Sequence, residues 1–218
     1  RKAQNYSRIA NMSVPERIMR NNVYSRISPT DMLTDAALAQ IDLQHPQRFM
    51  EELYESTESD SSLRRVLNLD LRVTLADSDL RKVNRMCELA GCSVHYPFLD
   101  DDVLNFSASI PDDMLIKDGK LRHFYKHAVR DFLPKDIITK KKHGFGVPFV
   151  EFTQRHKQLQ SFVYDTLTTL KKRDYIREHI LDSAIDDHRH GRKTTLTIIV
   201  WDLMMLELWF RNHMDEAA

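Results

Sequence analysis

The segment TLADSDLRKVNRMCELAGCSVHYPFLDDDVLNF, residues 74–106, contains a helix start, an apolar helical repeat and a helix stop in succession. Asp77 or Ser78 is a suitable N-cap, because a short polar side chain accepts a hydrogen bond from the first turn of a helix. Gly91 suits the left-handed position that follows a helix. The apolar residues between them recur at helical spacing, and they are Leu80, Val83, Met86 and Leu89. The segment therefore predicts a helix that ends before Gly91.

The second half of this segment predicts a break and a further helix. Pro97 disfavours the helical conformation of the residue before it, so residues 93–96 are expected to be extended. Asp100 can then cap a helix over residues 101–109. Similar signals predict helices after Pro15 with Ser13 as cap, from Pro46 onward, and over residues 32–41, 121–132, 151–170, 176–189 and 194–213. A strand at residues 71–75 is the less favoured alternative, and the predicted fold class is mainly α.

The composition is that of a folded, soluble protein, and it favours neither a nucleic-acid partner nor a membrane. The 218 residues carry 32 basic and 32 acidic side chains, so no net charge attracts the chain to an anionic polymer or bilayer. No apolar run approaches the roughly 20 residues that span a bilayer. The two cysteines, Cys87 and Cys92, fit reduced thiols better than a disulfide framework. A cytoplasmic protein is therefore expected.

The loop KKKHGFGVPF, residues 140–149, concentrates positive charge and backbone freedom. Gly144 and Gly146 allow the backbone to approach a ligand closely, and Pro148 stops a helix from running back through the loop. The lysines supply point charges for an anionic group. Such a loop can close over a phosphate, although the same residues also fit a solvated lysine run with a turn.

Three sequence blocks, in the same order and at the same spacing, give the chain a resemblance to a known family. They are residues 74–106, the end of the helix at Leu133 and Pro134, and the lysine loop. Together they resemble the synthetase domain of the asparagine synthase family of glutamine-dependent amidotransferases. The matching residues are Leu75, Asp77, Leu80, Lys82, Arg85, Met86, Pro97, Phe98, Leu99, Asp100, Leu133, Pro134, Lys142, Gly144, Phe145 and Pro148.

The resemblance covers only part of that family's pattern. The 218 residues contain no SGGxDS pyrophosphate loop, no SGEGxDExFGG motif and no N-terminal cysteine of the glutaminase half, and the five glycines form no such cluster. Residues 1–218 are therefore interpreted as the C-terminal helical part of a synthetase domain. The remainder of the synthetase and glutaminase domains are its expected partners, and a homo-oligomer is possible. The fragment alone is expected to be inactive and to hold no cofactor.

For the whole enzyme, the resemblance implies ATP and magnesium as cofactors and a small-molecule carboxylate as substrate. The carboxylate would be activated as an acyl-adenylate and then amidated by ammonia from glutamine. A rival hypothesis is a non-catalytic helical interaction module, in which Trp201, Trp209 and Phe210 mark a partner surface.

The resemblance implies that Lys142 is catalytic, because it occupies the position of the family's loop lysine, which stabilises charge on the α-phosphorus. Lys140 stands where the family has an arginine, and Gly144 matches the loop glycine. Both are candidate substrate- or nucleotide-binding residues. The alternative is that Lys142 is one of three equivalent solvated lysines.

Asp70 is a further candidate for substrate or nucleotide binding, at the family's acidic position before the first block. Because it lies between Leu69 and Leu71, burial is expected, and a buried carboxylate needs a partner. The candidate partners are Arg72, Arg81, Lys82 and Arg85. An ion pair that only packs helices together is an equally good interpretation.

Three further matched residues are assigned to the scaffold, with Asp77 and Asp100 as caps and Arg85 as a partner of either. The chain departs from the family pattern at several positions, so the identity of the carboxylate substrate stays open. These positions are Asn84, Ser93 and His95, together with Arg122 at the family's helix lysine, with Lys126 one turn further on.

Two groups of histidines are candidate metal ligands. His123 and His127 lie one helical turn apart but lack the glutamate of the HExxH motif. The second group, Asp186, Asp187, His188 and His190, reads as the polar end of a helix. Exposed histidines are the favoured interpretation in both cases, and no metal site is predicted.

Overall fold

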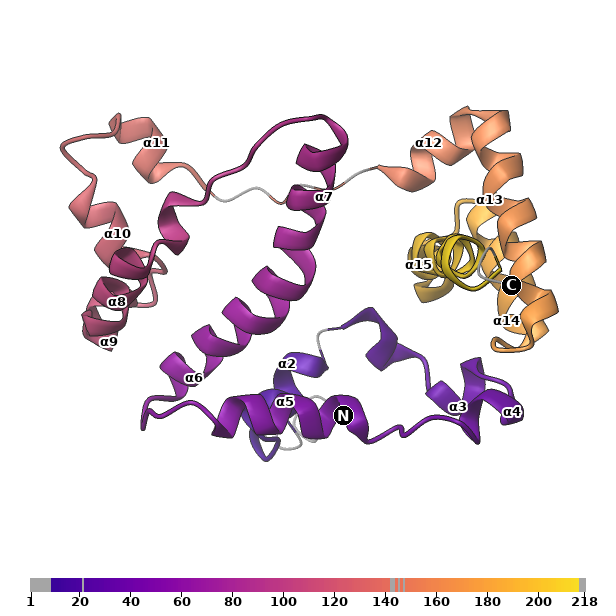
Figure 1. The fold of residues 1–218 in the computed structure, drawn as a ribbon, viewed down its shortest axis with the longest axis horizontal. Helices are drawn as coiled ribbons and strands as arrows, with labels where there is room; N and C mark the ends of the chain where they lie inside the picture. The colour runs from indigo at the N-terminus through magenta and orange to yellow at the C-terminus, as the bar shows by residue number, and fades with distance from the viewer. Residues whose placement is uncertain (1–8, 21, 142–143, 145, 147, 216–218) are drawn as a thin grey trace. The chain divides into compact units, whose positions relative to one another are not determined.

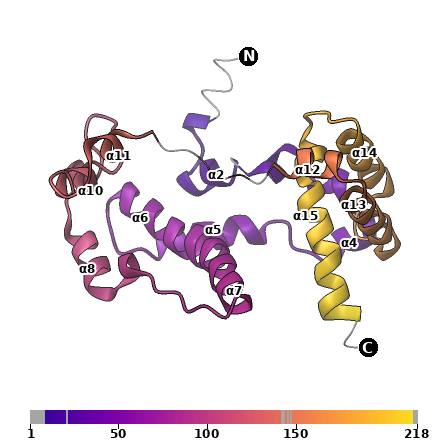
Figure 2. The ribbon, with the colours of Figure 1, turned by 90° about the horizontal axis from the view of Figure 1, so that it is seen from above.

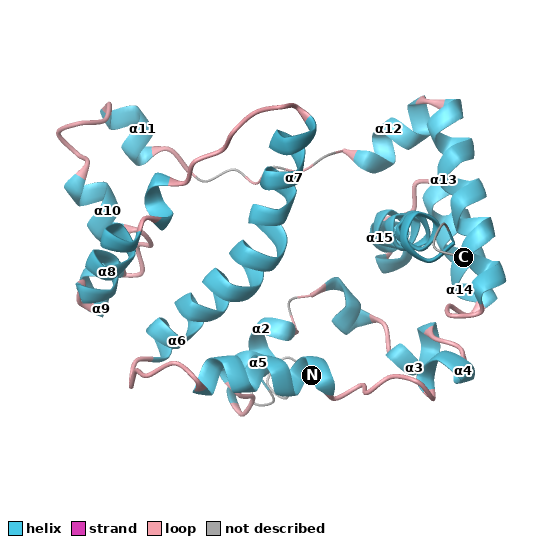
Figure 3. Ribbon diagram, in the orientation of Figure 1, coloured by secondary structure: helices cyan, strands magenta, loops and turns pink. Residues whose placement is uncertain are grey.

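The computed structural model describes residues 9–20, 22–141, 144, 146 and 148–215. Every element of regular secondary structure within these residues is a helix, which confirms the mainly α prediction (Figure 3). The only extended pairings among them are two isolated bridges, Leu33 with Ile176 and Lys117 with Lys120. The chain divides into two compact units. Unit 1 comprises residues 1–48 and 145–218, and unit 2 comprises residues 49–144, with α5 (His45–Glu55) running across the division.

The N-terminal part of unit 1 consists of short helices: α2 (Val14–Met19), η1 (Val23–Arg26), α3 (Pro29–Met32) and α4 (Asp35–Leu38). Ser13 and Glu16 form a reciprocal capping box at the start of α2, with Pro15 in its first turn, as predicted. The single run predicted over residues 32–41 is wrong, because Leu33 leaves the helix to pair with Ile176.

The core of unit 1 is built by α13 (Lys157–Leu170), α14 (Glu178–Arg189) and α15 (Thr195–Phe210), which lie side by side (Figure 2). Their apolar residues bury one another, and the fully or nearly buried members are Val163, Tyr164, Leu167, Leu170, Ile176, Ile180, Leu181, Ala184, Ile199, Val200, Leu203 and Met204. A preceding short helix, α12 (Phe149–Arg155), is separated from α13 by His156 in an extended conformation. The prediction of one helix over residues 151–170 is therefore wrong.

A buried carboxylate fastens the end of α15. Glu207 is fully buried and accepts hydrogen bonds from Arg173 in η4 (Lys171–Arg173) and from Arg211 in η5 (Arg211–Asp215). Burial alone raises the pKa of Glu207, but the two guanidinium groups outweigh it and hold this pKa below its usual value. Arg173 also pairs with Asp215 and lies over the Phe210 ring, 4.7 Å from its centroid. Glu207 and Asp202 are the two carboxylates of the apolar helix α15, and a carboxylate at position 207 was the sequence signal for this network.

The N-terminal helices are attached to this core by polar contacts. The Tyr24 hydroxyl donates to Asp202 of α15 at 3.0 Å. The Arg177 backbone donates to the Met32 carbonyl at 2.9 Å, and its guanidinium binds Asp35 at 2.7 Å. Distant parts of the sequence thus meet within unit 1.

Unit 2 is organised around one continuous helical rod. It runs through α6 (Ser62–Leu69), the π-helical segment η2 (Asp70–Leu80) and α7 (Arg81–Leu89) without a break (Figure 1). Asp77 lies inside this rod, so its predicted role as a helix cap is wrong. Gly91 follows the rod with φ of 67°, as predicted for a helix stop.

The rest of unit 2 contains shorter helices: η3 (Pro97–Leu99), α8 (Asp101–Ser109), α9 (Asp112–Leu115), α10 (His123–Ala128) and α11 (Lys135–Thr139). Asp100 caps α8 with the predicted bounds. The helix predicted over residues 121–132 is shorter, because Arg122 adopts the left-handed conformation with φ of 61°. Arg64 of α6 binds Asp112 of α9 at 2.8 Å and also donates to the Ile110 carbonyl, which holds these two elements together.

Candidate anion-binding site

A hollow of about 370 Å³ lies beside α10 and α11 in unit 2. Its floor is apolar and its edges carry three cationic side chains. The lining residues are Leu121, Arg122, Tyr125, Lys126, Val129, Leu133, Ile137, Ile138 and Lys140. Because none of these is a carboxylate, the hollow suits a ligand that combines negative charge with an apolar or aromatic part.

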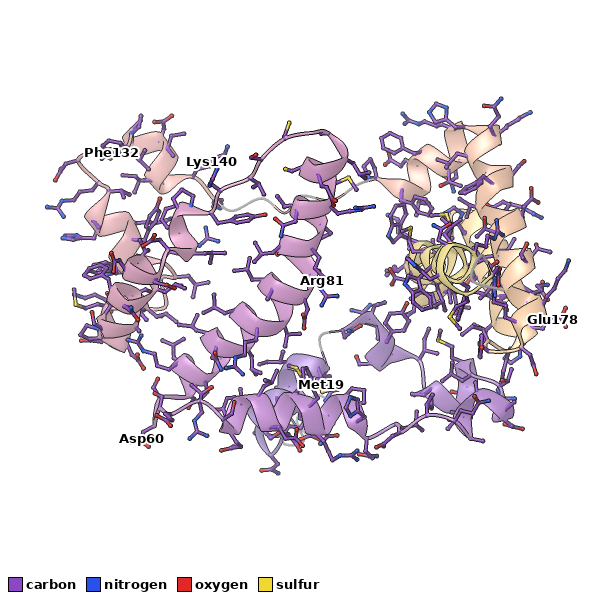
Figure 4. All side chains as sticks on the ribbon, viewed as in Figure 1. Met19, Asp60, Arg81, Phe132, Lys140 and Glu178 are labelled. Atoms are coloured by element: carbon purple, nitrogen blue, oxygen red, sulfur yellow. The ribbon has the colours of Figure 1, made fainter. Side chains whose placement is uncertain are left out.

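Local helix geometry brings the three cations together. Arg122 is the N-cap residue of α10, in the left-handed conformation, and Lys126 lies within that helix. Lys140 is the residue at which α11 ends (Figure 4). None of the three forms an ion pair with another described residue, so their charges are available to a ligand.

Charge is concentrated in this part of the sequence although the whole chain is neutral. Residues 117–141 contain eight Lys and Arg residues but only three Asp residues. The recorded ion pair in this stretch joins Arg130 to Asp131 at 3.4 Å. A local positive potential therefore remains, of the kind that raises the concentration of an anion near the surface.

Aromatic contacts link the hollow to the sequence block with the PFLD tetrapeptide. Phe98 packs edge-on against Tyr125, with ring centroids 5.8 Å apart. Phe106 of α8 packs against Phe124 at 5.9 Å. The first of the three blocks in the sequence thus contacts α10.

Of the residues predicted for the site, Lys140 lines the hollow, and Lys142 lies outside the described residues. Gly144 is exposed, and no atom lies within 4 Å of the position that a Cβ would take there. The close backbone approach expected of this glycine stays a prediction.

The predicted burial of Asp70 is wrong, whereas its role in substrate or nucleotide binding stays a prediction. Its side chain is exposed at the start of η2 and accepts a hydrogen bond from the Thr74 hydroxyl at 3.3 Å. The leucines on either side do not bury it, because neighbours in sequence point in different directions from a helix. None of the four predicted cationic partners binds it.

Those cations pair locally along the rod instead. Arg81, midway along it (Figure 4), binds Asp77 at 3.3 Å, and Arg85 binds Glu88 at 2.6 Å. The prediction that Arg85 binds Asp77 or Asp100 is therefore wrong. These are exposed pairs at helical spacing, and each contributes little to stability.

The histidines of the two groups differ in environment. The rings of His123 and His127 are nearly parallel with centroids 6.2 Å apart. His188, by contrast, is fully buried, so its predicted exposure is wrong. Its Nδ1 lies 3.1 Å from the Tyr164 hydroxyl, its Nε2 has no hydrogen-bond partner among the described residues, and burial lowers its pKa. No group of three or more potential metal ligands occurs in the described part of the chain.

Sequence reasoning missed the apolar floor of the hollow. Leu121, Tyr125 and Val129 follow one another at intervals of four, which was a usable signal for one apolar stripe. The cations Arg122 and Lys126 run beside that stripe with the same spacing. Residues of α10, of α11 and of the segments that flank them thus line the hollow with apolar side chains and three cations.

The family of the chain follows from comparison with known proteins. A family-wide sequence model described as asparagine synthase matches residues 2–211. The chain belongs to the asparagine synthase family. This asparagine synthase family member therefore has its cationic hollow within the matched region.

Individual relatives are distant and much longer. The chain is 22% identical over 168 residues to asparagine synthetase [glutamine-hydrolyzing] 1 of Bacillus subtilis, covering 75% of this chain and 26% of that protein. It is 20% identical over 166 residues to a Mycobacterium tuberculosis protein with the provisional name of a glutamine-hydrolyzing asparagine synthetase, covering 76% and 25%. The chain thus spans about a quarter of the length of these relatives. No solved structure matches it.

One further observation concerns membranes. Among the described residues, every helix is too short or too polar to cross a bilayer.

Proposed function

We propose that this chain is the C-terminal part of the synthetase domain of an ATP-dependent, glutamine-hydrolysing amidotransferase. The observation that supports this most strongly is the cationic hollow formed by Arg122, Lys126 and Lys140 over an apolar floor. It lies among the sequence blocks that the chain shares with its family. On this proposal the chain works with the remainder of the synthetase domain and a glutaminase domain, in the cytoplasm.

The donor set of the hollow fits phosphate oxygens. Arg122 offers a planar fork of N–H donors, whereas Lys126 and Lys140 offer compact charges on mobile stems. Magnesium prefers carboxylate ligands, and the described residues contain no cluster of three or more potential ligands. We therefore assign the phosphates of ATP to these cations and assign none of the described residues to magnesium.

In the proposed reaction, a carboxylate oxygen of the substrate attacks the α-phosphorus of ATP and pyrophosphate leaves. Ammonia from glutamine then attacks the acyl carbon of the acyl-adenylate, AMP leaves with its bonding electrons, and the amide loses a proton. Lys142 stabilises charge that develops at the α-phosphorus, while Arg122, Lys126 and Lys140 offset charge on the departing pyrophosphate. The substrate that accepts ammonia is a small carboxylate. If Asn84, Ser93 and His95 contact this substrate, it is a carboxylate other than aspartate.

The experiment is to measure pyrophosphate release from ATP by the longer protein that contains this chain. Lys142→Ala should lower the turnover rate by about a hundredfold or more, because the lost interaction is made mainly in the transition state. The Michaelis constant for ATP should change much less.

Lys141→Ala is the matched control, since it removes the same charge one position away and has no counterpart in the family pattern. It should change turnover by less than about threefold. Equal losses of turnover in the two variants would show a generally basic loop and would contradict the role of Lys142. No ATP-dependent pyrophosphate release by the wild type would contradict the amidotransferase proposal.

The alternative function, a non-catalytic interaction module, has one observation in its favour. Ile198, Trp201, Met205 and Trp209 form an exposed apolar stripe along α15, and the two tryptophans are 45% and 50% exposed. Phe210 does not belong to it, because this ring packs against Arg173 and Tyr175. An interaction module predicts that Trp201→Ala with Trp209→Ala abolishes partner binding while ATP has no effect on the protein.

A further inference from the structure

A second hollow lies on the other side of Lys126, with a volume of about 310 Å³. It is lined by Lys120, Leu121, His123, Lys126, His127 and Arg130. Five of these six side chains carry a positive charge or acquire one on protonation. It shares only Leu121 and Lys126 with the first hollow.

The rings of the two histidines in this hollow, His123 and His127, stack on each other. Their rings are tilted by only 16° from parallel, so protonation of both would bring two positive charges close together. The Nδ1 atom of His123 is buried and has no hydrogen-bond partner among the described residues. A buried polar atom without a partner is costly, so the hydrogen bonding of this ring is incomplete among the described residues.

No carboxylate lines this hollow to neutralise its cations. The nearest acidic residue in sequence, Asp131, binds Arg130 at 3.4 Å and is itself exposed. The elements packed against α10 are α9, which carries Asp112 and Asp113, and, through aromatic contacts, η3 and α8, the latter of which carries Asp101 and Asp102. Asp112 is already bound by Arg64 and Ser61. The lining itself therefore contains no acidic group, and its charge becomes more positive when the histidines are protonated.

We propose that this second hollow binds a tetrahedral dianion, such as the phosphate group of a phosphorylated small molecule, and binds it more tightly in mild acid. Lys120, Lys126 and Arg130 supply fixed charges, and His123 and His127 supply charges that appear on protonation. Histidine is the side chain that ordinarily changes charge between about pH 5 and 8. The proposal does not rest on the amidotransferase function, because four of the five basic residues lie outside the first hollow and only Lys126 is shared with it.

The probe for this site is inorganic sulfate, which stays a dianion over the whole range of the experiment. The histidine ring proton signals of the 218-residue chain are followed by NMR during sulfate titrations at about pH 6 and about pH 8. The affinity should be about tenfold higher at the lower pH, the effect of one added charge near 5 Å from a dianion in a solvent-exposed site. The signals of His123 and His127 should shift most.

Two sets of variants make the test specific. His123→Asn with His127→Asn should abolish the difference between the two pH values, and Lys120→Ala should weaken binding at both. Lys140→Ala, which changes only the first hollow, should leave the pH difference intact. Circular dichroism confirms that each variant keeps its helices. Absent binding near pH 6, equal affinity at both pH values, or a pH difference that survives the double substitution would overturn the proposal.

Discussion

The two units of the chain stabilise themselves in different ways. Unit 1 buries a cluster of twelve apolar residues between α13, α14 and α15. Among the described apolar residues of unit 2, only Leu69 and Ile110 are buried to a similar degree. Since apolar burial is the main favourable contribution to folding, most of the chain's intrinsic stability is expected to reside in unit 1.

Unit 2 instead exposes large apolar side chains along with its cations. Phe132 is 85% exposed, Leu121 68% and Phe98 67%. The element contacts that hold it include the ion pair of Arg64 with Asp112 and two aromatic contacts at α10. Unit 2, which carries both cationic hollows, is thus stabilised less by its own apolar burial than unit 1. Function-bearing regions commonly lie at the low-stability end of a structure.

The largest effect on this comparison is expected from Glu207→Ala. It removes the carboxylate that accepts hydrogen bonds from Arg173 and Arg211, and because each hydrogen bond to a charged group contributes about 1.5–3 kcal/mol, a loss of about 3–5 kcal/mol is expected. Both tryptophans of the chain lie in α15, so tryptophan fluorescence during urea unfolding reports on unit 1.

The control for Glu207 is Glu178→Ala at the start of α14 (Figure 4), where the carboxylate is exposed and lies 3.6 Å from Lys171. It should cost less than about 1 kcal/mol. Similar losses for the two substitutions would show that the buried network does not stabilise unit 1.

A smaller but still large effect is expected from Leu203→Ala in the core of unit 1. Leu203 is 1% exposed, and truncation of a buried leucine costs about 2–5 kcal/mol. Leu89→Ala at the end of the rod in unit 2 is the matched substitution, because Leu89 is 67% exposed. Its cost should stay within about 0.5 kcal/mol when urea unfolding is followed by far-ultraviolet circular dichroism. A larger loss for Leu89 than for Leu203 would reverse the comparison.

The smallest effect concerns pH and His188. Burial lowers the pKa of His188 in the folded state, so the unfolded chain takes up a proton that the folded chain refuses. The contribution of His188 is therefore complete above about pH 6.5 and falls as the pH drops below it, by about 1.4 kcal/mol per pH unit until the folded pKa is reached.

His188→Gln keeps a polar partner for Tyr164 but cannot titrate, so unit 1 should lose less stability between pH 7 and pH 5 than the wild type. Tryptophan fluorescence in urea at each pH measures this. His179→Gln, at an exposed position of the same helix, should keep the wild-type pH dependence. A wild-type slope in His188→Gln would mean that other groups account for the acid response.

Local signals in the sequence predicted local structure well. Ser13 with Pro15, Asp100 and Gly91 start or stop helices as expected, because each acts through its own backbone or the next turn. The break at His156 carries no glycine or proline and was not predictable in this way.

Properties that depend on tertiary contacts were predicted poorly. Asp70 has leucine neighbours in sequence but faces solvent, whereas His188 looks polar in sequence but is enclosed by Tyr164 and Phe149. Burial depends on which helices pack together, and a single sequence does not specify that. Of the cations of the first hollow, only Lys140 was predicted as a binding residue, and the apolar part of its lining emerged only from the structure.

The most direct test of the contrast between the units is native-state hydrogen exchange on the 218-residue chain. Amides in α13 and α15 should exchange only through global unfolding of unit 1, whereas amides in α10 and α11 should be protected about a thousandfold less, equivalent to about 4 kcal/mol. Equal protection in α10 and α15 would contradict the claim that the core of the chain lies in unit 1.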